Sequence, residues 1–207
     1  MGSPNQIVLA THNKDKTAEF QSIFSGLEVE VVSLDGFPSV GQIEEDGETL
    51  EENALKKARE VFRLTGIPSL ADDTGLEVFY LDYAPGVYSA RYAGPGATYR
   101  DNVAKLLADL RGVPPRRRGA QFRCVLALVG WDSRDLQTEG VCQGQIIEEP
   151  RGQNGFGYDP IFVPSGLNQT YAELDPSMKN SLSHRGRAAK EMVELIHRKS
   201  GVTVPSA

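Results

Sequence analysis

Two adjacent aspartates, Asp72 and Asp73, follow a short apolar run in this sequence of 207 residues. Neighbouring carboxylates beside apolar sequence repel each other unless a cation or hydrogen bonds stabilise them. Mg²⁺ prefers oxygen ligands and retains several waters, so such a pair suits a magnesium site. Phosphatases that form an aspartyl-phosphate space their aspartates as D-x-D, a spacing that Asp72-Asp73 does not have. The pair therefore predicts a metal ligand and a general base rather than a nucleophile.

A second acidic group, Glu44-Glu45-Asp46, lies in a glycine-containing segment that we expect to be a loop. An acidic loop on its own is usually a solvated surface feature. Carboxylates near a metal site would instead add oxygen ligands. The segment gains interest because Asp72 and Asp73 already suggest a bound cation.

The polar stretch Thr11-His12-Asn13-Lys14-Asp15-Lys16 connects an apolar run to a segment with helical periodicity. Backbone amides at a helix start favour anions, and Lys14 and Lys16 add positive charge. The stretch is not a Walker loop, because the G-x-x-x-x-G-K-[ST] pattern is missing. Locally, a phosphate-binding loop and a capped helix start with solvated lysines both fit.

The glycine-rich segment Gly155-Phe156-Gly157-Tyr158-Asp159-Pro160 is a third candidate for binding chemistry. Glycines allow a ligand to approach the backbone closely. Phe156 and Tyr158 could stack on a nucleotide base, and Asp159 could accept hydrogen bonds from its edge. An ordinary turn whose aromatic residues belong to the core fits the isolated segment better.

The segment 179–186 gathers Lys179, His184 and Arg185 ahead of the last predicted helix. Three cationic or titratable groups this close form a wall that suits phosphate or carbonyl oxygens. An exposed basic helix start explains the same composition about equally well. Taken together, the groups described above suggest a phosphate-rich ligand, a divalent metal and a base pocket.

The elements that must position these residues alternate between strands and helices. Apolar runs predict strands at 6–10, 27–31, 69–71, 76–81, 122–130, 140–147 and 161–163. Helical spacing predicts helices over 20–27, from Thr49 to Gly66, from Thr98 to Gly112, and over 189–196. Hairpins interrupt the alternation, so the pattern predicts an α/β fold with a mixed sheet.

Composition excludes several classes of protein. The formal net charge of -6 argues against nucleic acid or an anionic membrane surface as the main partner. No run of about 18 apolar residues and no signal peptide are visible, so a cytoplasmic protein is expected. Cys124 and Cys142 lie in apolar runs, so we expect them to be buried, reduced thiols.

The order of these motifs resembles that of the Ham1/RdgB-type inosine triphosphate pyrophosphatase family. The resemblance extends over nearly the whole chain, and six matching stretches in family order make a chance match untenable. These stretches are residues 10–16, 44–54, 71–78, 84–94 and 155–162, and residues 170–174 taken with 179–186.

The resemblance implies a role for each candidate residue. Asp73 is implied as the general base, with Glu44, Glu45, Asp72 and Asp73 as the carboxylates around Mg²⁺. Residues 11–16 are implied as the triphosphate loop, Lys57 as a lysine facing the phosphates, and Thr74 as a substrate contact. The implied base pocket consists of Phe156, Gly157, Tyr158, Asp159, Lys179, His184 and Arg185.

The implied function is magnesium-dependent hydrolysis of purine nucleoside triphosphates such as ITP, dITP and XTP to the monophosphate and pyrophosphate. The implied architecture is a single domain, residues 1–207, with an elongated mixed sheet flanked by helices and two lobes around a central substrate cleft. A homodimer is also implied.

Three positions depart from the family pattern: His12 stands where many members have glycine, Thr74 replaces the commoner serine, and 175–178 replaces an acidic stretch. Two other functions stay open. One is a Maf-like pyrophosphatase acting on other nucleotides, and the other is a nucleotide-binding regulator without turnover.

Overall fold

A computed structural model describes residues 6–25 and 29–200 of the chain. These residues form two compact units. Unit 1 contains the described residues up to 73, residues 124–140 and residues from 185 onward. Unit 2 contains residues 74–123 and 141–184.

The strands form a mixed sheet in the order β2-β1-β3-β5-β6-β7, with β4 paired to β3. β1 pairs in parallel with β2 and β3, whereas β4 and β7 pair antiparallel with β3 and β6. This arrangement confirms the predicted α/β fold with a mixed sheet. The strand bounds are β1 Gln6–Leu9, β2 Glu30–Ser33, β3 Ser69–Val78, β4 Pro85–Gly86, β5 Gly119–Val129, β6 Leu136–Ile146 and β7 Phe162–Pro164.

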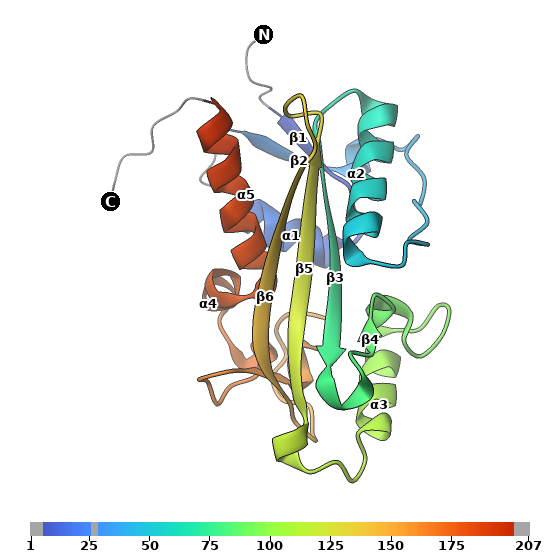
Figure 1. The fold of residues 1–207 in the computed structure, drawn as a ribbon, viewed down its shortest axis with the longest axis vertical. Helices are drawn as coiled ribbons and strands as arrows, with labels where there is room; N and C mark the ends of the chain where they lie inside the picture. The colour runs from blue at the N-terminus through green and yellow to red at the C-terminus, as the bar shows by residue number, and fades with distance from the viewer. Residues whose placement is uncertain (1–5, 26–28, 201–207) are drawn as a thin grey trace. The chain divides into compact units, whose positions relative to one another are not determined.

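Unit 1 has its own hydrophobic core, which fills one face of its strands. Phe20 of α1 (Lys14–Ile23) and Met192 of α5 (His184–Ser200) pack there with Leu126 and Leu128 of β5. Side chains alternate along a strand, so the intervening Val125, Ala127 and Val129, which are also buried, face the other way. Figure 1 shows α2 and α5 on opposite sides of these strands.

Helix α2 (Leu50–Thr65) begins and ends as its sequence predicts. The Thr49 side chain accepts a hydrogen bond from the Glu52 amide at 3.1 Å, which confirms the predicted cap. The Glu52 carboxylate accepts from the amide of Glu48 at 2.8 Å, one residue earlier than in a standard capping box. Gly66 ends the helix in the left-handed conformation.

Unit 2 has a second core, in which α3 (Tyr99–Asp109) packs on the strands. Leu106 and Leu110 contact a cluster that includes Leu76 of β3 and Phe122 of β5. The short helix α4 (Pro176–Leu182) precedes α5 and was not predicted from the sequence.

The predicted break between strands 69–71 and 76–81 is wrong, because β3 runs without interruption from Ser69 to Val78. Asp72 and Asp73 therefore lie inside a strand rather than in a loop at its end. The strand continues because charged side chains of unit 1 compensate both carboxylates, as described below. The strand predicted over 27–31 corresponds to β2, and residues 27 and 28 of that prediction lie outside the described residues.

No helix within residues 6–25 and 29–200 is long and apolar enough to cross a membrane.

The capping box of α3 gives a test of the fold. The amide of Thr98 donates to Asp101 at 2.9 Å, and the amide of Asp101 donates to the Thr98 hydroxyl at 3.2 Å. Thr98→Ala should lower the free energy of unfolding by about 1 kcal/mol and the melting temperature by roughly 2–4 °C. Thr98→Ser keeps the acceptor and should stay near wild type. Equal losses in both variants, measured by thermal unfolding, would contradict this cap.

Candidate functional site

The site is organised by Asp72 and Asp73 on β3, which are only 3% and 6% exposed. Consecutive residues of a strand point to opposite faces of the sheet. Asp72 lies two residues after Leu70, so both side chains point to the same face of the sheet. The Leu70 side chain belongs to the core formed with α1 and α5. Asp73 points to the other face, where α2 lies. Each carboxylate is therefore compensated by a different set of side chains.

Asp72 is held by two cations. Its Oδ2 lies 3.0 Å from Lys16 Nζ of α1 and 3.5 Å from an Arg185 Nη of α5. Burial raises the pKa of Asp72, but the positive charges of Lys16, Arg185 and Lys57 outweigh burial and hold it well below its ordinary range. Asp72 is therefore ionised at neutral pH and joins α1 and α5 to the sheet through its ion pairs.

Arg185 is fully buried in unit 1 and also forms an ion pair with Glu19 of α1. Its guanidinium lies 5.7 Å from the centre of the Phe20 ring. The family resemblance implied that Arg185 completes a base pocket. In this structure the guanidinium bridges Glu19 and Asp72, and its contact with a base stays a prediction.

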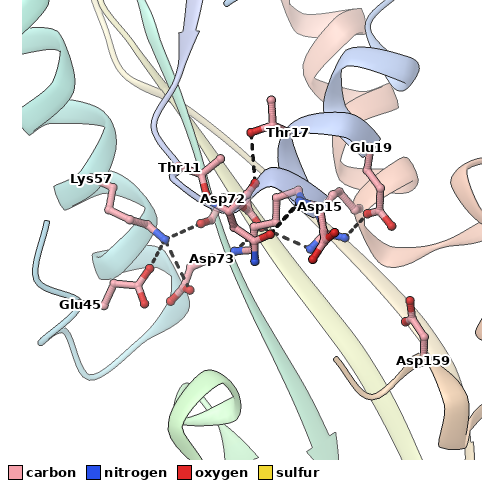
Figure 2. Close-up of polar contacts among 12 residues, drawn as sticks. Thr11, Asp15, Thr17, Glu19, Glu45, Lys57, Asp72, Asp73 and Asp159 are labelled. Carbon is pink, nitrogen blue, oxygen red and sulfur yellow. Dashed lines mark hydrogen bonds and ion pairs between the residues drawn. The ribbon is translucent and has the colours of Figure 1, made fainter. Parts of the chain in front are cut away.

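Asp73 and Glu45 of the acidic loop both contact the ammonium group of Lys57 (Figure 2). Lys57 Nζ bonds to the Glu45 carboxylate, lies 3.7 Å from Asp73 Oδ1, and donates to the backbone oxygen of Asp72 at 2.6 Å. Burial raises the pKa of Asp73, and the negative charge of Glu45 raises it further, while Lys57 and Lys16 only partly oppose this shift. Asp73 is thus a carboxyl whose proton affinity is higher than usual, as a general base requires.

The charged residues that contact Asp72 and Asp73, directly or through a shared partner, form with them the unit 1 charge cluster. Its members are Lys16, Glu19, Glu45, Lys57, Asp72, Asp73 and Arg185.

The start of α1 is capped by Asn13, whose side-chain oxygen accepts from the amides of Asp15 at 2.9 Å and Lys16 at 3.2 Å. The Thr11 hydroxyl accepts from the Asn13 amide at 3.2 Å, so the loop is bonded internally. His12 is exposed, and its ring nitrogen lies 3.3 Å from the Gly41 oxygen. Lys14 and Asp15 are exposed as well, whereas Lys16 turns toward Asp72.

The carboxylates of Glu45 and Asp73 could provide part of the ligands of a metal ion, but not a full set. Glu45 and Asp73 approach the same ammonium group, so their oxygens lie near one another, while Glu44 is exposed. Among the described residues, no three His, Cys, Asp or Glu side chains are grouped so as to hold a metal ion by themselves. Mg²⁺ is usually bound by one or two carboxylates together with waters and substrate phosphates. A pair of carboxylates therefore fits Mg²⁺ that arrives with a phosphorylated ligand.

Unit 2 contains a separate polar group built on Asp159. The Asp159 carboxylate forms a buried ion pair with Lys179, which is 4% exposed, and accepts from the Phe156 amide at 2.9 Å. The Lys179 ammonium lies 5.1 Å from the centre of the Phe156 ring. Gly155 has φ +70, and a Cβ there would meet Asp159 Oδ2 at 2.0 Å. A side chain at position 155 would therefore displace the buried pair.

Two residues predicted for the base pocket belong to the core of unit 2 in this structure. Tyr158 is buried, and its hydroxyl donates to the Ser89 oxygen at 2.9 Å. The His184 ring stacks on Phe122 with centroids 4.6 Å apart. Gly157 has φ +62 beside these residues in the chain, and Thr74 is half-buried on β3.

Sequence reasoning missed two residues that contact the site. Glu19 lies three residues after Lys16 on α1, so the helical period already placed both on one face. Asn53 lies four residues before Lys57 on α2, so the two share one edge of the helix, and both residues are buried. Without the position of β3, the helical period alone did not show that this edge faces Asp73.

The fold and the charge cluster together define a mixed α/β protein with a buried, charge-paired polar site on its sheet. A sequence profile of the Ham1 family matches residues 7–195. The chain belongs to the Ham1 family.

Relatives of the chain are similar over most of their length. It is 48% identical over 193 residues to the dITP/XTP pyrophosphatase of Desulforamulus reducens, covering 93% of this chain and 96% of the relative. It is 50% identical over 198 residues to the protein of the same name from Nitratidesulfovibrio vulgaris, covering 91% and 94%.

Solved structures support the same family. A HAM1 protein from Coxiella burnetii is 45% identical with a TM-score of 0.84, covering 93% of this chain and 98% of that one. The Staphylococcus aureus Ham1 protein is 37% identical with a TM-score of 0.81, covering 94% and 98%.

The ion pairs of Asp72 predict a specific pH dependence of stability. Asp72→Asn removes the charge that compensates Lys16 and Arg185, so the free energy of unfolding should fall by about 3–5 kcal/mol at neutral pH. The folded pKa of Asp72 lies below its ordinary value of 3.8. The contribution of its charge to stability is therefore complete well above pH 3.8 and is lost as the pH falls from there through the lower folded pKa.

The measurement is urea unfolding of both proteins between pH 7 and pH 2.5. The difference in the free energy of unfolding between wild type and Asp72→Asn should be constant above about pH 5. Below pH 4 this difference should decrease by up to about 1.4 kcal/mol per pH unit. Asp135→Asn, which removes a surface partner of Arg59, serves as the control and should change stability little at any pH. A difference independent of pH would contradict the assigned ionisation.

Proposed function

We propose that the protein hydrolyses inosine and xanthosine triphosphates, in ribose or deoxyribose form, to the nucleoside monophosphate and pyrophosphate. The names of its relatives support this substrate class, since proteins 48–50% identical to it are called dITP/XTP pyrophosphatase. Removal of these nucleotides would keep deaminated purines out of the nucleotide pool. The observation that carries the proposal is the joining of Lys16, Lys57 and Asp73 in the unit 1 charge cluster.

The lysines of this cluster suit a polyphosphate. Lys16 and Lys57 each lie against carboxylates in the structure, at 3.0 Å from Asp72 and 3.7 Å from Asp73. An ammonium group has three donors, so each lysine can bond a phosphate oxygen and keep a carboxylate partner. The lysines would thereby orient the triphosphate and offset the charge that develops on its oxygens.

Glu45 and Asp73 are the residues proposed to hold Mg²⁺, with Glu44 as a further carboxylate of the same loop. When bound, the metal would supply positive charge to the phosphate oxygens. Asp72 is a poorer ligand than the sequence suggested, because Lys16 and Arg185 already occupy its carboxylate.

Asp73 is proposed to act as the general base. Its carboxylate accepts a proton from a water molecule that attacks the α-phosphorus, and the bond to pyrophosphate breaks. Burial raises the pKa of Asp73, which strengthens it as a proton acceptor. Positioning and electrostatic stabilisation by the lysines are expected to contribute most of the acceleration, as in other phosphoryl transfers.

Base recognition is proposed for unit 2. Phe156 offers a ring that can stack on a purine, and Asp159 and Lys179 offer an acceptor and a donor beside it. A site that donates hydrogen bonds to the 6-oxo group of a purine leaves those donors unpaired when the base is adenine, because adenine has a 6-amino group there. Rejection by this route can reach roughly 10⁴-fold.

A substrate panel tests the function directly. Pyrophosphate release should be fastest with ITP, dITP and XTP and slower by about two or more orders of magnitude with ATP, because of the unpaired donors. GTP has the same 6-oxo group as ITP, so the enzyme must reject it through the substituent at position 2 of the purine ring. Equal kcat/KM for GTP and ITP would refute the proposal, and a preference for modified pyrimidine nucleotides would favour a Maf-like enzyme. No release with or without Mg²⁺ would favour a regulator.

Replacement of the proposed base tests the mechanism. Asp73→Asn should lower kcat for dITP by at least about 10²-fold, because the amide cannot accept the proton. The KM for dITP should change much less, since the lysines remain. Asp135→Asn, an isosteric change at an exposed ion pair, is the matched control and should retain wild-type kcat. Near-normal turnover of Asp73→Asn in a steady-state assay would remove Asp73 from this role.

A further inference from the structure

Asn53 is a buried polar residue to which neither the sequence motifs nor the proposed mechanism assigns a task. It lies in the first turns of α2 and is 1% exposed. Its side-chain oxygen accepts a hydrogen bond from the Gly47 amide at 2.8 Å. Its amide nitrogen, Nδ2, is buried and makes no hydrogen bond of ordinary geometry within the described residues.

The contact with Gly47 fixes the acidic loop on α2. A Cβ at position 47 would lie 2.7 Å from the Asn53 side-chain oxygen, so the loop backbone approaches this oxygen as closely as glycine permits. Glu45, two residues before Gly47, bonds to Lys57 on the same helix. Asn53 and Lys57 are four residues apart and therefore share one face of α2. Together they hold both ends of the segment 45–47.

Lys57, one turn further along the same face of α2, lies 3.7 Å from Asp73 Oδ1, and the Asn53 amide lies beside the same carboxyl group. Since the amide oxygen is directed at Gly47, the planar group must direct Nδ2 elsewhere, and its two hydrogens remain available. Asn53 favours the ionised form of Asp73 and so lowers a pKa that burial raises. A buried donor without an acceptor is costly, and hydrogen bonds of catalytic groups often tighten when a substrate binds. Asp73 and the water that it activates would provide the missing acceptor.

We infer that Asn53 is a positioning residue for the hydrolysis. Its amide oxygen fixes the acidic loop, and its amide nitrogen orients the Asp73 carboxylate toward the attacking water. The inference rests on the proposed function, because it assigns Asn53 to the same reaction.

The test is a double-mutant cycle with dITP as the substrate, using wild type, Asn53→Ala, Asp73→Asn and the double variant. Asn53→Ala should lower kcat by about 10- to 100-fold, the scale of a misplaced reacting group, with KM within about threefold. In the Asp73→Asn background the same change should cost less than about twofold, because no base remains to be oriented. Losses that multiply, or a wild-type kcat in Asn53→Ala, would overturn the inference.

Two controls separate positioning from folding. Asn102 of α3 is also a buried asparagine whose side chain bonds a loop amide, that of Ala93, at 2.8 Å. Asn102→Ala should lower the melting temperature and leave kcat within about twofold, a scale well below that of a misplaced base. If Asn53→Ala does not fold, Asn53→Asp replaces it, because the carboxylate keeps an acceptor for Gly47 and lacks the donor. Asn53→Asp should lose kcat as Asn53→Ala does, and retention of activity would refute the assignment.

The outcome also distinguishes this inference from the proposed function. A wild-type protein that does not hydrolyse dITP or XTP refutes the function itself. A wild type that hydrolyses them, combined with independent losses in the cycle, refutes the role of Asn53 alone.

Discussion

The burial of two consecutive carboxylates within one strand is the constraint on which this site depends. Asp72 and Asp73 cannot share compensating charges equally, because adjacent strand residues face opposite sides of the sheet. Asp72 is therefore paired with cations of α1 and α5, while Asp73 lies with Lys57 of α2. Removing either set of cations would leave a buried charge uncompensated, which is among the most destabilising changes a core can suffer. One dipeptide thus forms ion pairs with side chains of three helices, α1, α2 and α5.

The two carboxylates end in different electrostatic states. Asp72 has two direct cationic partners, and its pKa is lowered despite full burial. Burial raises the pKa of Asp73, because its nearest ammonium group, that of Lys57, is more distant and Glu45 adds repulsion. Environments that push the pKa values of neighbouring acids apart are typical of sites where one acid holds the structure and the other reacts. The same pair of residues thereby supplies both a fixed charge and a proton acceptor.

The sequence predicted the fold class and several residues of this polar site, but not the geometry of the site. The α/β class, the cap at Thr49 and the importance of Asp72-Asp73 all follow from local patterns and are present in the structure. The continuity of β3 could not be predicted, because polar residues inside a strand are tolerated only when distant residues compensate them. Arg185, which lies 113 positions after Asp72, provides such compensation, and no local pattern connects the two. The ambiguity at Tyr158 and His184 has the same origin, since an aromatic or imidazole ring suits a core as well as a pocket.

The charge balance of the unit 1 charge cluster bears on what it can bind. Its members include four carboxylates, Glu19, Glu45, Asp72 and Asp73, and three cations, Lys16, Lys57 and Arg185. With every group ionised, the cluster therefore has one excess negative charge, and a bare triphosphate would be repelled. A divalent cation reverses the sign of this excess. A polyanion then becomes favourable at the same place where Asp73 keeps an elevated proton affinity. In the proposed mechanism a divalent cation would therefore have to accompany the triphosphate, as in other enzymes that act on metal–nucleotide complexes.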